Sequence, residues 1–201
     1  MATEYTDVDK LILGRWQDVM ALFDAHEELQ DRVEEVVDEV GERLGKWLDG
    51  RGYMVETDSR EPTFCIGKDD WYHKRKDCWV VYLEIGGFAP FGFRKVKEDN
   101  PYAWLQTFNL EHLKLKDADR IEFAKGLRQE IGDAAKSWAH RNVDDATGPL
   151  GRYFTDIKEP DRVELISQPD KLFDFATMAW GELLTLVDPI DRVLAKFKAK
   201  E

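Results

Sequence analysis

Residues 79–85 read WVVYLEI, and this stretch decides the fold because its apolar side chains repeat with a period of two. Every second residue from Trp79 to Ile85 is large and apolar, and two of the three residues between them are apolar as well. A period of two is typical of a β-strand. A strand that is apolar on both faces is typical of the centre of a sheet. The sequence therefore predicts a central strand here.

The flanking segments predict three more strands. Residues 53–57, 63–66 and 91–96 are short apolar or alternating runs bounded by glycine, proline or charged residues. Because these strands follow one another closely, antiparallel pairing in sequence order is favoured. Residues 102–115 are ambiguous, and we expect them to be irregular with at most one short strand.

Helical periodicity dominates the first fifty residues. Residues 8–23 and 27–48 each place their apolar side chains on one helical face. We expect two helices joined by a short link around residues 24–26, with a capping residue at Thr6 or Asp7.

The second half of the chain is also mostly helical. Residues 117–140 predict one helix, residues 152–157 a short extended piece, and residues 161–167 and 170–198 further helices. Pro189 lies inside the last of these and should kink or restart it.

Together these elements predict one α+β domain over residues 1–201. Its order is α-α-β-β-β-β-α-α, an antiparallel four-stranded meander packed by long helices. The helix pair spans residues 6–50, the meander residues 53–97 and the C-terminal helices residues 117–200.

Composition restricts the classes of function. The formal net charge of −12 disfavours a protein that binds nucleic acid non-specifically. We expect no export signal, no membrane span and no disulfide framework from the two cysteines, hence a cytoplasmic protein. We expect no cofactor.

One short segment interrupts this acidity with cations beside aromatic rings, a combination suited to binding an acidic partner. We take it as the candidate partner-binding site: Trp71, Tyr72, His73, Lys74, Arg75 and Lys76. The alternative is a solvated hairpin turn whose cations protect a sheet edge.

A second candidate surface is the acidic outer face of the helix at residues 27–48. Its members are Glu27, Glu28, Asp31, Glu34, Glu35, Asp38, Glu39 and Glu42. Such a row can dock on a basic protein, and the alternative is an ordinary solvated face. The two charged surfaces could also meet, within one chain or between two copies.

Motifs for catalysis are sparse. A metal-dependent nuclease needs two acids and a lysine, and only Asp156 and Lys158 match the second half of that pattern. Cys65, His73 and Cys78 lack the paired spacing of a zinc site, so we expect no metal centre.

Three segments together resemble a known family: residues 66–71 (IGKDDW), 79–85 and 91–93 (FGF), followed by GPLGRYF at 148–154 and a helix ending near Asp188. This pattern is similar to the aromatic-rich region that follows the nuclease core in bacterial PD-(D/E)XK superfamily proteins, over residues 29–193. The catalytic residues of that family have no counterparts here. The resemblance implies the accessory, non-catalytic part as a protein of its own.

We therefore expect a binding protein rather than an enzyme, one that acts through a protein partner or by self-association. By analogy, bacterial or phage defence or anti-defence is the expected setting. Two alternatives stay open: a divergent metal-dependent nuclease, and a small-molecule sensor with an aromatic pocket.

Overall fold

The computed structural model describes residues 5–60, 62–88, 100–114, 117–134, 138 and 149–198. It confirms an α+β fold with an antiparallel sheet. The helices are α1 (Asp7–Gly14), α2 (Trp16–Leu48), α3 (Asp117–Ile131), α5 (Glu159–Ser167), α6 (Pro169–Leu184) and α7 (Val187–Lys198). Three 3-10 helices are η1 (Asp69–Trp71), η2 (Phe108–Leu113) and η3 (Gly132–Ala134).

The main sheet has five strands, so the prediction of a four-stranded meander was wrong. Its order is β1 (Tyr53–Asp58), β2 (Thr63–Lys68), β5 (Tyr82–Gly86), β6 (Tyr102–Gln106) and β7 (Leu150–Tyr153). All neighbours in it pair antiparallel. The order α-α-β-β-β-β-α-α is wrong for the same reason, since α3 lies between β6 and β7. The predicted strand at residues 91–96 lies outside the described residues.

Strand β6 falls in the segment that the sequence predicted to be irregular. Its inward residues Ala103 and Leu105 are fully buried, and they alternate with the half-buried rings of Tyr102 and Trp104. The outward residues are themselves large and aromatic, so the segment lacks the alternation of polar and apolar residues from which a strand is predicted.

The stretch that decides the fold is divided between two sheets. Trp79 ends β4 (Cys78–Trp79), which pairs with β3 (Tyr72–His73) in a separate hairpin. Val80 and Val81 form a buried bend, and the central strand β5 begins only at Tyr82. The prediction of a central strand was correct for residues 82–85.

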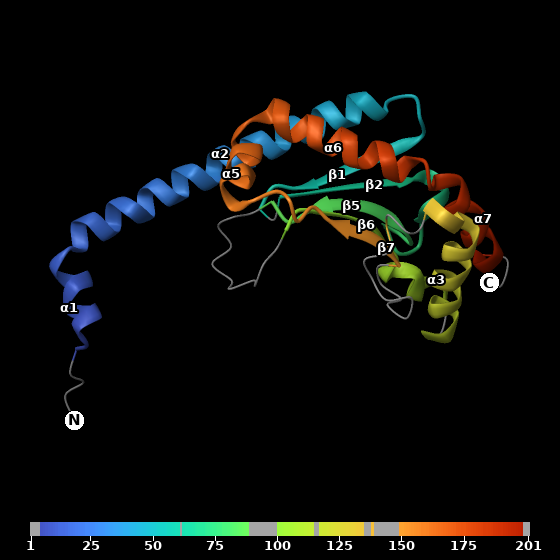
Figure 1. Cartoon of the computed structure of the whole chain (residues 1–201), viewed down its shortest axis with the longest axis horizontal. Coiled ribbons are helices and arrows are strands. Elements are labelled where there is room, and N and C mark those ends of the chain that lie inside the picture. Colours follow the sequence, from blue (N-terminus) through green and yellow to red (C-terminus); the bar gives the residue numbers. More distant parts are fainter. Residues whose placement is uncertain are drawn as a thin grey trace.

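Helices α2 and α6 lie side by side over one face of the sheet, and α3 and α7 pack together at one end (Figure 1). The covered face carries the fully buried side chains of Phe64, Ile66, Leu83, Ile85 and Leu105. Phe64 meets the Trp180 ring of α6 edge-on, with 6.4 Å between the ring centroids. The core therefore lies between this face and the two helices.

The opposite face of the sheet is lined by aromatic rings that rest on glycines. A Cβ at Gly67 would overlap the ring of Trp79, and one at Gly151 would overlap the ring of Trp104. Tyr102 and Trp104 stack with 4.0 Å between their centroids. The glycines allow large rings to lie flat on the strands.

Helix α2 is continuous, so the predicted link at residues 24–26 was wrong. That segment contains neither glycine nor proline, and the real break follows Gly14, where Arg15 leaves the helical conformation (φ −123°, ψ 31°). At 1.5 Å per residue, α2 is about 50 Å long. Its first buried residue is Val33, so its first half projects from the body as an arm that ends in α1 (Figure 1).

The C-terminal predictions were correct in part. Helix α3 stops at Ile131 and not at residue 140, because Gly132 takes a positive φ of 59°. Helix α7 restarts at Val187 with Pro189 in its first turn, as predicted. No helix within the described ranges combines the length and hydropathy that a membrane span requires.

Two glycines of α2 test how closely this helix packs on the sheet. Gly45 has open space where a Cβ would be, whereas a Cβ at Gly41 would overlap Thr57 of β1. We expect Gly45→Ala to stabilise the protein by roughly 0.5–1 kcal/mol, because alanine favours helix. Gly41→Ala should give no such stabilisation, or should destabilise the protein, because its Cβ would overlap Thr57. Urea unfolding measures both, and equal gains at the two positions would contradict the close packing.

Candidate partner-binding site

The β3–β4 hairpin is anchored by a tryptophan at its base. Trp71 is fully buried, and its indole Nε1–H donates to Asp191 Oδ1 of α7 at 2.6 Å. The sequence placed Trp71 among the surface residues that contact a partner, and this was wrong. A buried indole N–H requires an acceptor, and Asp191 supplies it.

Asp191 also holds Lys68 at the end of β2. Lys68 Nζ donates to Asp191 Oδ2, and the two side chains are 21% and 34% exposed. Burial by itself would lower the pKa of Lys68, but the hydrogen bond and the charge of Asp191 outweigh burial, so its pKa is raised. One carboxylate thus ties β2, η1 and α7 together.

The hairpin turn is set by its backbone. The N–H groups of Lys76 and Asp77 both donate to the carbonyl oxygen of His73, at 2.9 and 3.0 Å. Asp77 takes a positive φ of 55°. The Tyr72 hydroxyl donates to Asp77 Oδ1, and this hydrogen bond is the main reason why the pKa of Tyr72 is raised. The geometry leaves Lys74, Arg75 and Lys76 exposed.

A cavity of about 460 Å³ lies beside the hairpin, where η2 and the end of α7 approach it. It is lined by Tyr72, His73, Lys74, Arg75, Val80, Leu113, Lys114 and Lys198. Asn109 of η2 donates to the Trp79 carbonyl at 2.8 Å, which holds η2 against the hairpin. Lys198 Nζ donates to the carbonyl oxygen of Asp70, which holds α7 there.

The lining of this cavity is cationic. Lys74, Arg75, Lys114 and Lys198 contribute four positive charges, and none of them forms an ion pair with a carboxylate of the described residues. The Nδ1 atom of His73 is buried and has no hydrogen-bond partner among the residues that the structure describes. Unpaired polar groups of this kind are satisfied when a ligand supplies the missing partner. Val80 and Leu113 add apolar surface beside the charges.

Four cavity residues were missed by sequence reasoning: Val80, Leu113, Lys114 and Lys198. Val80 directly follows the hairpin, whereas the other three lie far along the chain from it and carry no local motif. Conversely, Lys76 was predicted as a contact residue and lies outside the cavity lining.

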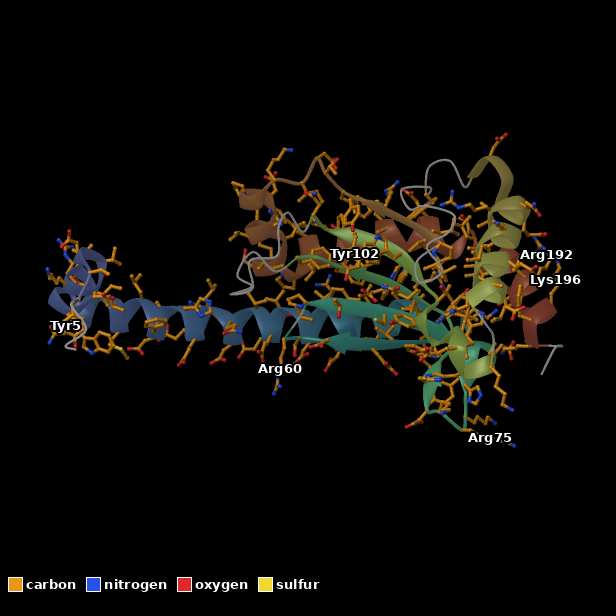
Figure 2. The ribbon with its side chains drawn as sticks, turned by 90° about the horizontal axis from the view of Figure 1, so that it is seen from below. Tyr5, Arg60, Arg75, Tyr102, Arg192 and Lys196 are labelled. Atoms are coloured by element: carbon orange, nitrogen blue, oxygen red, sulfur yellow. The ribbon has the colours of Figure 1, made fainter. Side chains whose placement is uncertain are left out.

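The acidic face of α2 is exposed except at Glu34, which is half-buried. Glu39 pairs with Arg43 at 3.6 Å, and Glu42 with Lys46 at 3.9 Å. Figure 2 places Arg75 at the opposite end of the molecule from Tyr5 and the arm, so the arm's acids and the hairpin of one chain do not meet.

The candidate catalytic residues lie in two separate parts of the fold. Asp156 is exposed in the loop after β7, and Lys158, the residue before α5, donates from its Nζ to the Thr155 carbonyl. His73 pairs with Cys78 across the hairpin, whereas Cys65 lies on β2. Burial is the main reason why the pKa values of both thiols are raised, which disfavours the thiolate. The described residues contain no group of three or more metal-ligating side chains.

Comparisons of the chain with protein-family models, curated proteins and solved structures give no match.

The Asp191 link yields a prediction. Asp191→Asn keeps an oxygen for the Trp71 indole but removes the charge beside Lys68, so we expect a loss of about 1–2 kcal/mol in unfolding free energy at neutral pH. Asp174→Asn, at an exposed site on α6, is the matched control and should change little.

The raised pKa of Lys68 also predicts how the effect of Asp191→Asn on stability changes with pH. Because the pKa of folded Lys68 is raised above 10.5, its contribution is fully present below pH 10.5 and is lost as the pH rises through the folded value. The difference between wild type and Asp191→Asn should therefore narrow in that alkaline range. Chemical unfolding at several pH values measures this, and a difference that stays constant would contradict it.

Proposed function

We propose that this chain is a non-catalytic binding protein that captures an acidic segment of a protein partner at the basic cavity beside the β3–β4 hairpin. The observation that carries the proposal is a set of four cations that form no ion pair with the described residues, gathered at one cavity of a protein whose net charge is −12. Clustered cations are costly to a fold because they repel one another, and folding gains little from such segregation.

The composition of the lining supports a peptide segment as the ligand. Carboxylates of the partner would pair with the lysines and the arginine, and an apolar side chain would contact Val80, Leu113 and Tyr72. The cavity of about 460 Å³ matches the size of sites that hold small ligands or a few side chains.

A nucleic acid fits less well. A polyanion extends far beyond one cavity, and the acidic remainder of this protein would repel its phosphates. The resemblance to accessory regions of PD-(D/E)XK proteins supports a role without catalysis, and a setting in bacterial or phage defence stays a prediction.

The proposal is tested with a fluorescein-labelled peptide of alternating Glu, Asp and Phe. Fluorescence polarisation should detect binding to the wild-type chain, and binding should weaken as the salt concentration rises. The double variant Lys74→Glu/Arg75→Glu should lower the affinity at least about tenfold, because it reverses two charges in the lining.

The matched control is Lys76→Glu/Lys196→Glu. It makes the same change in net charge at two exposed cations outside the lining: Lys76 on the hairpin turn, and Lys196 on α7, which Figure 2 labels. It should reduce affinity much less than the cavity variant. Equal losses in both variants would contradict a built site, and tighter binding of a single-stranded oligonucleotide than of the peptide would identify a nucleic-acid ligand instead.

A further inference from the structure

The projecting arm ends in an apolar surface that no other part of the described chain covers. We define the arm tip as residues 5–23, which comprise α1 and the first turns of α2. Large hydrophobic side chains here are 39–72% exposed: Tyr5, Val8, Leu11, Ile12, Leu13, Trp16, Met20, Leu22 and Phe23. The rest of the described chain exposes far fewer of this kind, namely Met54, Tyr153, Val163 and Met178.

The arm tip is built as an ordered element in spite of this exposure. A capping box starts α1: Asp9 N–H donates to Thr6 Oγ1 at 3.2 Å, and Thr6 N–H donates to Asp9 Oδ2 at 2.7 Å. None of the eight residues of α1 is buried. A helix of that length is marginal in water by itself, so it gains stability only when its apolar face is covered.

The apolar area is large enough for a stable association. Summed over all sides of the two helices, the exposed apolar side chains of the arm tip offer on the order of 1,000 Å², above the few hundred that monomers normally expose. The body of the same chain lies too far away, because α2 runs about 25 Å from Trp16 to its first buried residue, Val33.

The distribution of charge along the arm indicates which kind of partner the arm tip binds. The arm tip carries three acids against two bases, whereas residues 24–42 carry nine acids against one arginine. Two copies of a chain with net charge −12 repel each other, and the arm tip is the nearly neutral, apolar end of a long spacer that keeps the bodies apart. Helices that lie on lipid surfaces are instead rich in lysine and arginine, and the acids that follow would be repelled by anionic lipid.

We infer that the arm tip is a self-association surface that pairs with the arm tip of a second copy. The contact is isologous, with the same residues on both sides. Trp16, Met20 and Phe23 share one helical face at positions i, i+4 and i+7 and form its centre.

The test is the mass of the full chain in solution, measured by sedimentation equilibrium up to about 100 µM. Wild type should approach twice the 23.4 kDa of one chain. Met20→Glu/Phe23→Glu should weaken association by at least about 100-fold, because it buries charges in the contact. Ala25→Glu/Gln30→Glu is the matched control, since it adds the same two charges at exposed positions of α2 outside the arm tip, and it should remain dimeric.

Two further readouts separate this inference from the proposed function. Added salt should strengthen the dimer by screening the repulsion between acidic bodies, whereas it weakens peptide binding at the hairpin. Circular dichroism should show that the tip variant remains folded, because the replaced side chains contact no core. A monomeric wild type, a dimer insensitive to the tip variant, or uptake of the monomer by phosphatidylcholine vesicles would each overturn the inference.

Discussion

The architecture depends on covering one apolar face of the five-stranded sheet. Phe64, Leu83 and Leu105 lie on that face, and α2 and α6 bury it. Only the part of α2 from Val33 onward is needed for this task. The same helix continues outward for another seventeen residues without a single buried side chain, so one element serves both as a wall of the core and as a projecting arm. Burial of apolar area supplies the stability of the body, and the arm depends on local helix formation and on whatever covers its tip.

A second constraint places the basic cavity. The carboxylate of Asp191 accepts from Trp71 and from Lys68, so it joins η1 and β2 to α7. Because the base of the hairpin is held in this way, its turn, the end of η2 and the last turn of α7 come together and their cations line one cavity. Three residues of the hairpin turn, His73, Lys74 and Arg75, therefore share one cavity lining with residues of η2 and α7.

The charges of the molecule are segregated along its length. Arg75, which lines the basic cavity, and Tyr5 of the nearly neutral apolar tip lie at opposite ends of the molecule (Figure 2), and the acidic face follows α2 between them. The two surfaces proposed for association lie at opposite ends, so both could be occupied at the same time. If both are used, a dimer formed through the arm tips would present two basic cavities on widely separated bodies, and binding to a partner with two acidic segments would gain from avidity.

Local patterns in the sequence determined much of this protein. The apolar stripe of residues 27–48, the strands at 53–57 and 63–66, the capping residue Thr6 and the restart at Pro189 depend on neighbours within a few positions, where periodicity and backbone chemistry decide the structure. The cation cluster of the hairpin was visible for the same reason. Tertiary structure alone decided that β6 joins the sheet, that Trp71 is buried, and that Lys114 and Lys198 reach the hairpin. These features depend on contacts between residues from 16 to more than 100 positions apart, such as the 16 positions between Gly86 and Tyr102 and the 120 between Trp71 and Asp191, and no local pattern encodes such a contact.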